Sequence, residues 1–224
     1  MTERDVWAEI DLSALAHNYR EIKKCIKGNA KFCAVVKANA YGHGALKAAQ
    51  VALREGASYL AVATLPEALE LRQDGFYAPI LILGLVPLTA APSVVAHDLT
   101  TTVCTREFTA ALSEAAVNQG KSVKVHLKID TGMGRIGIPA EEAADMAKFI
   151  ATLPGLELEG MFSHFAAADS KDKSFTNRQL ELFRSAEEAI RTVGIKIPLR
   201  HIAESASILE MPEAHFDMVR AGII

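Results

Sequence analysis

The chain has 224 residues, of which half are hydrophobic and 23% are charged. This composition supports a buried core and excludes a disordered or low-complexity protein. Lys and Arg number 24 against 27 Asp and Glu, a net charge of −3, so no basic excess favours the phosphate backbone of nucleic acids or an anionic membrane. We therefore expect neither nucleic acid nor membrane as a partner.

The N-terminus, the longest apolar run and the cysteines together favour a cytoplasmic protein. The N-terminus MTERDVWAEIDL is acidic where a secretory signal is basic and then apolar. The most apolar run, residues 77–88, is only 12 residues long and contains two prolines, too short to span a bilayer. Cys25, Cys33 and Cys104 form no CxxC pair and have no histidine at ligand spacing, which predicts three buried thiols and no metal site.

The first predicted element is a helix over residues 12–26, because Leu12, Tyr19 and Ile22 lie on one face of a 3.6-residue period behind a cap at Asp11 or Ser13. Apolar, strand-like runs then alternate with helical patterns. The strands are expected at 32–37, 59–64, 79–84, 99–104, 123–130, 156–165, 197–204 and 217–224. The helices are expected at 44–56, 65–75, 106–120, 139–155 and 175–194, the second of them opened by a capping box of Thr64 and Glu67.

Eight strands that alternate with helices predict one α/β domain over residues 1–224, a (β/α)8 barrel of the TIM type. A doubly wound open sheet is the alternative. The chain stops within or just after the eighth strand, so the closing helix is missing. We expect the outer face of that strand to be bare or covered by something outside this chain.

The first strand ends in Lys37, at the end of the barrel where reactive residues gather. A buried lysine must be paired or lose its charge, and a lowered pKa is what a Schiff-base lysine uses. A solvated lysine at the rim is the alternative.

The fifth strand alternates apolar residues with Lys124, His126, Lys128 and Asp130 and then runs into TGMGRIG at 131–137. That segment matches the G-x-G-x-x-G dinucleotide fingerprint, which would make the chain an NAD-dependent oxidoreductase. The following helix is expected only near residue 139, whereas the fingerprint glycines run directly into a helix N-terminus. This interpretation is therefore the less favoured one.

The last three strands carry the remaining candidates. The sixth ends in His164, the seventh in Glu204 and Ser205, and the eighth contains Arg220 and Gly222. Barrels often bind phosphate in the loops after strands seven and eight. A lysine, a phosphate cup, an imidazole and a buried arginine in this order indicate a site for pyridoxal 5′-phosphate.

The segment VKANAYGHGA at 36–45 resembles the cofactor-lysine motif of the alanine racemases, which use pyridoxal phosphate to interconvert L- and D-alanine. Segments 7–20, 126–137, 162–169 and 216–223 resemble the same family in the same order, so the resemblance covers nearly the whole chain. It implies a cytoplasmic isomerase that supplies D-alanine for peptidoglycan precursors of the cell wall, and a homodimer in the intact family enzyme.

The resemblance also implies a role for each site residue. Lys37 would carry the cofactor as a Schiff base and move a proton at the substrate α-carbon. Tyr41, Ser205, Gly222 and Ile223 would bind the phosphate. His164 would stand against the pyridine ring, with Arg220 at its nitrogen. Arg135 would approach the cofactor's ring oxygen and the substrate carboxylate, and Lys128 matches a position that is carbamylated in some members. No metal is implied.

Two departures from the family bear on activity. Glu204 stands where the family usually has Asn, and a carboxylate beside a phosphate dianion is repulsive unless it turns away or is protonated. The family's C-terminal β domain, which supplies a tyrosine to the partner's site as the second base, has no counterpart here. We therefore expect a truncated racemase that binds the cofactor weakly and racemises slowly or not at all, with alanine or serine as substrate. A non-catalytic barrel that carries pyridoxal phosphate is the alternative.

Overall fold

Eight parallel strands form the wall of a nearly closed barrel in the computed structural model, which describes residues 6–223. The strands are β1 Lys31–Val35, β2 Tyr59–Val62, β3 Ile80–Ile82, β4 Thr100–Val103, β5 Val123–Asp130, β7 Leu156–Phe162, β8 Leu199–His201 and β9 Met218–Ala221. They pair in the order β8-β7-β5-β4-β3-β2-β1-β9, and the short β6, Ile138–Pro139, pairs with the end of β5.

The barrel closes between β8 and β9 by two backbone hydrogen bonds. The Asp217 N–H donates to the Arg200 carbonyl and the Arg220 N–H to the Ala203 carbonyl, each at 3.0 Å. An open doubly wound sheet has no such closure, so the prediction of a (β/α)8 barrel is confirmed.

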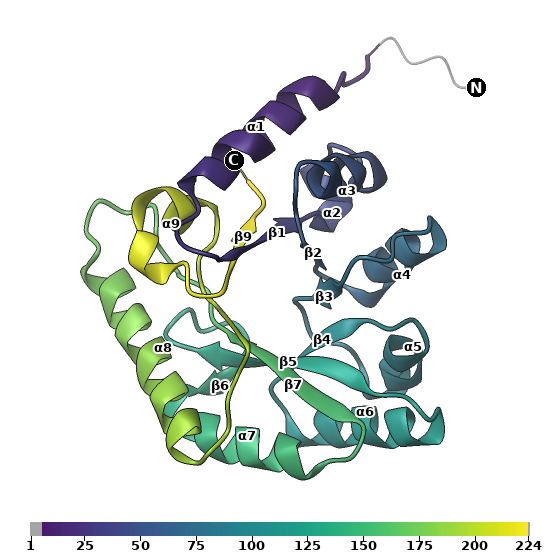
Figure 1. Ribbon diagram of the computed structural model, residues 1–224, viewed down its shortest axis with the longest axis vertical. Helices are drawn as coiled ribbons and strands as arrows, with labels where there is room; N and C mark the ends of the chain where they lie inside the picture. The colour runs from purple at the N-terminus through teal and green to yellow at the C-terminus, as the bar shows by residue number, and fades with distance from the viewer. Residues whose placement is uncertain (1–5, 224) are drawn as a thin grey trace.

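Helices surround the strands, as Figure 1 shows. They are α1 Leu12–Cys25, α2 Lys37–Tyr41, α3 Ala45–Arg54, α4 Leu65–Gln73, α5 Ala91–Ala96, α6 Arg106–Asn118, α7 Ala143–Thr152, α8 Ser174–Thr192 and α9 Ser205–Glu210, with 3-10 turns at Leu88–Ala90, Ala140–Glu142 and Pro212–Ala214. Two predicted caps are present: Asp11 accepts the N–H groups of Ser13 and Ala14, and Glu67 accepts that of Thr64.

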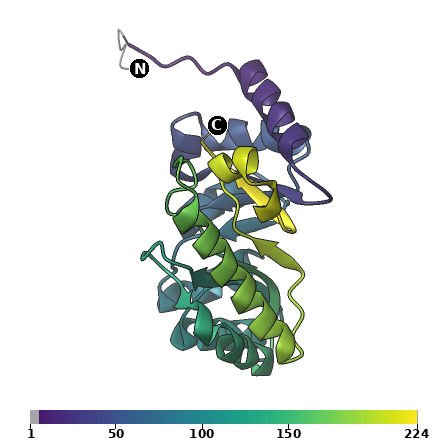
Figure 2. The same cartoon turned by 90° about the vertical axis from the view of Figure 1, so that its left-hand side faces the viewer.

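The prediction that the outer face of the last strand is bare, or covered by something outside this chain, was wrong. Val219 and Ala221 of β9 are fully buried, in the same apolar cluster as Tyr19 of α1 and Ile208 of α9. The sequence did not reveal α9, because its six residues are too few to show a helical period. In both ribbon views α1 and α9 lie beside β9 at one side of the barrel (Figures 1 and 2).

The apolar core divides between two layers. A large cluster fills the space between strands and helices, and a smaller one, with Tyr59, Leu81 and Met218, lies inside the barrel. The alternation predicted for β5 is confirmed, since Val125 and Leu127 pack outward while His126 and Lys128 are buried as polar residues. Of the three cysteines only Cys33 is fully buried, so the prediction of three buried thiols was too strong.

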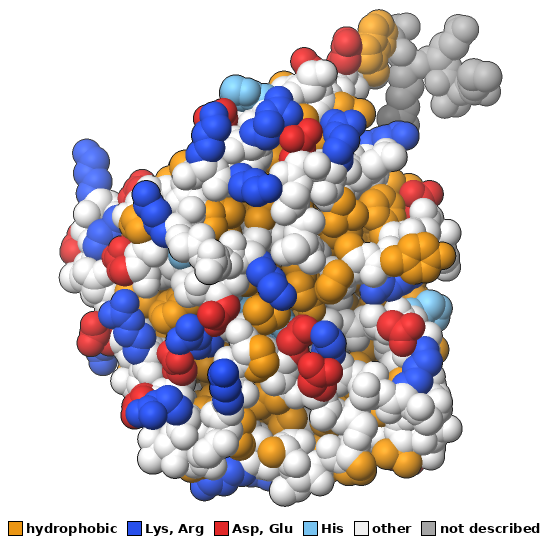
Figure 3. All heavy atoms as spheres, in the orientation of Figure 1, with side chains coloured by type: hydrophobic (Ala, Val, Ile, Leu, Met, Phe, Trp, Pro, Cys, Tyr) orange, Lys and Arg blue, Asp and Glu red, His pale blue; other side chains and the backbone are white. Residues whose placement is uncertain are grey.

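On the face that Figure 3 shows, Lys and Arg side chains are interspersed with Asp and Glu and with hydrophobic side chains. Among residues 6–223, no helix combines the length and the apolar composition needed to cross a bilayer.

Candidate functional site

A cavity of about 800 Å³ opens at the carboxyl ends of the strands. All of the site residues that the family resemblance implies line it, together with Glu204: Lys37, Tyr41, Lys128, Arg135, His164, Glu204, Ser205, Arg220, Gly222 and Ile223. They lie on five strands or on the segments that follow them. The barrel topology therefore brings them together, as expected for the carboxyl-terminal face of this fold.

Lys37 and Tyr41 are placed by a left-handed turn that the sequence did not predict. Ala38, Asn39, Ala40 and Tyr41 all have φ between 51° and 55°, a conformation that costs roughly 1–2 kcal/mol for each non-glycine residue. Glu67 holds the start of this turn, because its carboxylate accepts the Ala38 N–H at 2.7 Å. The end of the turn is held where Asn39 accepts the Ala45 N–H at 2.8 Å.

The turn brings the Tyr41 hydroxyl to a small polar cup. The Gly222 N–H donates to the Ser205 hydroxyl at 3.1 Å, and a Cβ at position 222 would lie 2.4 Å from the Tyr41 hydroxyl oxygen. A side chain at this position would therefore have to displace the ring of Tyr41. Burial raises the pKa of Tyr41, which keeps its O–H as a donor. Two hydroxyls and a backbone N–H that converge in this way can bind an anion.

Arg220 is buried, with 4% of its surface exposed. Its Nη2 donates to the carbonyls of Ser163 (2.8 Å) and Ile202 (3.0 Å), and its Nη1 donates to His201 Nδ1 at 2.6 Å. Burial lowers the pKa of Arg220 only to about 10, so it remains a cation at neutral pH. Its Nε has no acceptor among the described residues, although Arg220 lines the cavity.

His164 lies beside this arginine, with its Nδ1 3.4 Å from Nη2. Burial, followed by the positive charge of Arg220, lowers the pKa of His164 to about 3. The imidazole is therefore neutral at physiological pH and can pack against a ring or accept a hydrogen bond.

Lys128 is the second buried cation, 3% exposed, with its Nζ donating to the Ile129 carbonyl at 3.0 Å. Burial and then Arg220 lower the pKa of Lys128 to about 7. Its amine is thus partly neutral at physiological pH. Arg135 is exposed on the loop after β5 and lines the cavity without a carboxylate partner among the described residues.

Glu204 turns toward α9 rather than standing free in the cup. Its Oε2 accepts the Ala206 N–H at 2.6 Å and its Oε1 lies 3.1 Å from the Ser207 hydroxyl. The carboxylate therefore caps the helix, as an asparagine can at the same position.

The charges of the cavity favour an anion. Lys37, Lys128, Arg135 and Arg220 line it, against the acidic residues Asp169 and Glu204. Within the described part of the chain, no group of three His, Cys, Asp or Glu side chains is arranged to hold a metal.

Several residues around the site escaped the sequence analysis. Glu67 is one, since its bond to Ala38 joins positions 29 residues apart. Phe162 is another: the Lys128 amine lies 5.0 Å and the Arg220 guanidinium 5.4 Å from the centre of its ring. The only signal for Glu67 was its capping-box spacing, which gave no hint of a contact with the lysine turn.

These observations define a (β/α)8 barrel with a cation-lined cavity around a lysine that follows the first strand. The family model for the N-terminal domain of alanine racemase matches residues 10–224, and the chain belongs to this family. It is 50% identical to the alanine racemase of Desulfovibrio desulfuricans over 222 residues, 99% of this chain and 60% of that protein. The corresponding identity with an alanine racemase of Clostridium perfringens is 46%, over 57% of that protein.

Solved structures agree with the sequence comparison. The alanine racemase of Clostridium difficile 630 superposes with a TM-score of 0.94 at 39% identity, over 99% of this chain and 59% of the other. That of Bacillus anthracis, solved with bound L-Ala-P, gives 0.93 at 38% identity, over all of this chain and 58% of the other. The chain thus spans about three fifths of the length of the relatives that it matches.

Proposed function

We propose that the chain binds pyridoxal 5′-phosphate with Lys37 as its covalent anchor, and that it is the barrel of a racemase that acts on alanine. The relatives named above, all alanine racemases, support the reaction and the substrate. The observation that carries the proposal is a single cavity that joins the Lys37 amine to the polar cup of Tyr41, Ser205 and Gly222. D-alanine for cell-wall precursors is the product that this assignment implies.

The residues present fit the cofactor. The cup offers hydroxyl and amide donors to a phosphate, and Gly222 leaves it open where any side chain would collide with Tyr41. The free Nε–H of Arg220 suits a ring nitrogen, and an arginine, which keeps its own proton, disfavours a protonated pyridine there. When bound, the cofactor supplies an electron sink for the substrate carbanion. A weaker sink shortens the life of the carbanion and limits side reactions.

The neutral form of Lys128 fits a carbamate at this position, the modification that the family resemblance gives for some members. A neutral amine attacks carbon dioxide to form an N–C bond and releases one proton to solvent, whereas an ammonium cannot. A pKa of about 7 makes this amine available near neutral pH. The resulting carbamate anion would replace a buried cation and face Arg135, which we assign to the substrate carboxylate.

Racemisation requires removal of the α-proton from one face and its return to the other, hence a base on each face. We assign one base to Lys37. The family resemblance assigns the other to a tyrosine outside the segment that this chain matches. We therefore expect the chain alone to exchange the α-proton of one alanine enantiomer and to racemise slowly.

Proton NMR of L- and D-alanine in D₂O, with the chain and pyridoxal phosphate, tests this assignment. We expect deuterium to enter one enantiomer faster than the other, Lys37→Ala to abolish the exchange, and Lys47→Ala, on the exposed face of α3, to leave it unchanged. A racemisation rate equal to that of an intact family enzyme would contradict the one-base assignment. Cofactor binding with no exchange of either enantiomer would favour the non-catalytic carrier.

A further inference from the structure

A chain of buried hydrogen bonds runs through the barrel from the cavity to its opposite end. It begins at Arg220, passes through His201 on β8 and His126 on β5, and ends at Glu159 on β7. Both imidazoles are completely buried and Glu159 is 8% exposed. His201, His126 and Glu159 do not line the cavity.

The chemistry of the two ends fixes the direction of every bond. An arginine only donates, so its Nη1, 2.6 Å from His201 Nδ1, leaves that nitrogen as the acceptor and the ring proton on Nε2. His201 Nε2 lies 2.8 Å from His126 Nδ1, which must therefore accept in turn. His126 then carries its proton on Nε2 and donates it to Glu159 Oε2 at 3.1 Å.

The electrostatics agree with two neutral rings. Burial lowers the pKa of both His126 and His201, and the positive charge of Arg220 lowers both further. The hydrogen bond and the charge of Glu159 oppose this shift at His126, but the pKa of His126 remains below its ordinary value. Although burial opposes it, the hydrogen bonds from His126, Lys124 and Tyr59 lower the pKa of Glu159 to about 2, so the terminal acceptor is a carboxylate. A buried cation and a buried anion are thus joined through two imidazoles.

The backbone is shaped for this contact. The pairing of β5 with β7 slips between Val125 and His126, so that Glu159 is an extra residue on β7 between Leu158 and Gly160. A bulge of this kind redirects a side chain. The next residue, Gly160, lies against the imidazole of His126, where a Cβ would come within 2.7 Å of the ring.

We infer that Glu159 is a positioning residue for Arg220: through His126 and His201, its carboxylate determines which ring nitrogens carry protons and so holds the guanidinium in one orientation at the cavity. Without an acceptor at position 159, His126 can place its proton on Nδ1. His201 would then have to present an N–H to the N–H of Arg220. The effect on pyridoxal phosphate rests on the proposed function, but the proton positions do not.

The test is nitrogen-15 NMR of the histidine rings in the chain without cofactor, with signals assigned from the His126→Asn and His201→Asn chains. We expect both rings to be neutral with the proton on Nε2 from about pH 5 to about pH 8. Glu159→Gln, whose amide oxygen still accepts, should keep this pattern. Glu159→Met should shift His126 toward the Nδ1–H form and weaken the affinity for pyridoxal phosphate about tenfold.

Lys124→Met is the matched control, since it removes another partner of Glu159 at 2.6 Å and leaves the acceptor in place. It should change neither the proton positions nor the affinity. An imidazolium or an Nδ1–H ring in the unsubstituted chain would overturn the inference, and so would a Glu159→Met chain with unchanged spectra and affinity. If Glu159→Met does not fold, the spectra of the unsubstituted and Glu159→Gln chains test the inference, which requires the ring proton on Nε2 of both histidines in each chain. If the unsubstituted chain binds no cofactor, the proposed function fails while the ring spectra still decide this inference.

Discussion

Gly222 and Tyr41 approach each other so closely that a single added methyl group blocks the cup. A Cβ on residue 222 would lie 2.4 Å from the Tyr41 hydroxyl oxygen. We predict that Gly222→Ala lowers the affinity for pyridoxal phosphate by at least about tenfold while the chain still folds, because the contact lies at the cavity and not in the core. Titration of cofactor absorbance measures the affinity.

A double-mutant cycle distinguishes this mechanism from a general distortion. Tyr41→Phe removes the oxygen that the new methyl group would meet, so adding Gly222→Ala to Tyr41→Phe should cost much less than it does in the parent chain. Fully additive losses would show that the cup does not depend on this contact.

The lowered pKa of Lys128 should make the stability of the chain depend on pH. Its pKa falls from about 10.5 to about 7 on folding, so between these pH values the unfolded chain binds a proton at Lys128 that the folded chain does not. The free energy of unfolding therefore rises with pH across this window. In buffer free of carbon dioxide, Lys128→Met should be more stable than the parent near pH 6, by on the order of a few kcal/mol.

That difference should shrink as the pH rises across this window and vanish only above about pH 10.5, where the lysine is neutral in both states. Urea unfolding at several pH values measures it, with Lys47→Met, an exposed lysine, as the control. A difference that stays constant with pH would mean that Lys128 is not a buried cation with a lowered pKa.

Site residues could be predicted from the sequence where they belong to a recognisable motif. Lys37, Tyr41 and Arg220 were assigned in advance, and all three line the cavity. Glu67 and Glu159 were not, because each acts through a partner far along the chain: Glu67 contacts Ala38, and Glu159 contacts Tyr59 across 100 residues. Only the folded barrel brings such pairs together.

The left-handed turn of α2 depends on Glu67. One carboxylate accepts the N–H groups of Ala38 (2.7 Å), Ala63 (2.8 Å) and Thr64 (3.0 Å). The amide of Glu67→Gln has one acceptor oxygen, so at least one of the three N–H donors loses its partner. We predict a loss of about 0.5–1.5 kcal/mol in the free energy of unfolding, together with weaker cofactor binding because the turn carries Lys37 and Tyr41.

Glu70→Gln is the matched control, since Glu70 is exposed on the same helix. It should change stability by less than about 0.5 kcal/mol. Equal effects of the two substitutions would argue that helix α4 as a whole, and not the turn, responds to the lost charge.

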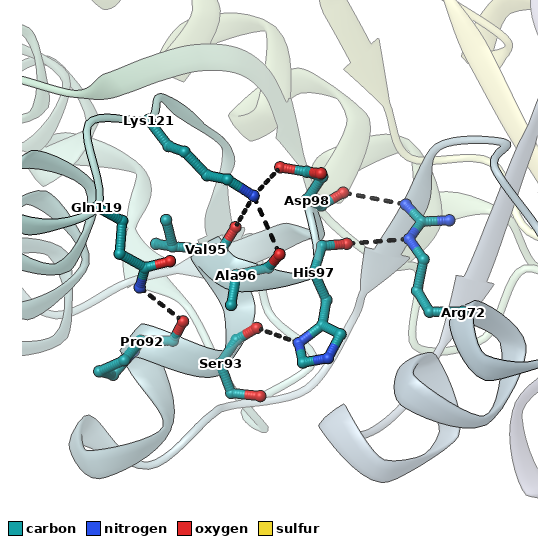
Figure 4. Close-up of polar contacts among 9 residues, drawn as sticks. All are labelled: Arg72, Pro92, Ser93, Val95, Ala96, His97, Asp98, Gln119 and Lys121. Atoms are coloured by element: carbon teal, nitrogen blue, oxygen red, sulfur yellow. Dashed lines mark hydrogen bonds and ion pairs between the residues drawn. The ribbon is translucent and has the colours of Figure 1, made fainter.

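Two cations hold the C-terminal end of α5, a six-residue helix that precedes β4. Lys121 donates to the carbonyls of Val95 and Ala96 and pairs with Asp98 at 2.9 Å, and Arg72 donates to the carbonyls of His97 and Asp98, as Figure 4 shows. Cations are favourable at a helix C-terminus, where the carbonyls have no partner.

We predict that Lys121→Met lowers the free energy of unfolding by about 1 kcal/mol. Lys148→Met is the control, because Lys148 pairs only with the exposed Asp145 at 3.5 Å and should contribute less than about 0.5 kcal/mol. Thermal unfolding of the three chains compares them, and equal losses for both substitutions would contradict the role of the helix end.

At the level of elements, the sequence located all eight strands but extended several of them too far. The sixth was expected to reach residue 165 and ends at Phe162, and the seventh was expected over 197–204 and is Leu199–His201. Among the excess residues, His164, Phe165 and Glu204 lie beyond the ends of these strands and line the cavity. Helices α2, α5 and α9 were not predicted, because five or six residues carry no measurable period.

The molecule as a whole is a barrel with a mixed interior. The interior combines an apolar cluster, with Tyr59, Leu81 and Met218, and buried charges, with Lys128 and Arg220 at the cavity. Repeating strand and helix patterns predicted the barrel, because topology follows from alternation and hydrophobic period. They did not predict how the buried charges pair, which depends on side-chain geometry across the barrel.

Lys37 is the proposed anchor of pyridoxal phosphate in this cavity. The most direct measurement is the visible spectrum of the purified chain with added pyridoxal phosphate, followed by borohydride reduction and peptide mass mapping. We predict a yellow species and a reduced adduct on Lys37 that is absent from Lys37→Ala. No visible band, or an adduct spread over exposed lysines with none on Lys37, would contradict it.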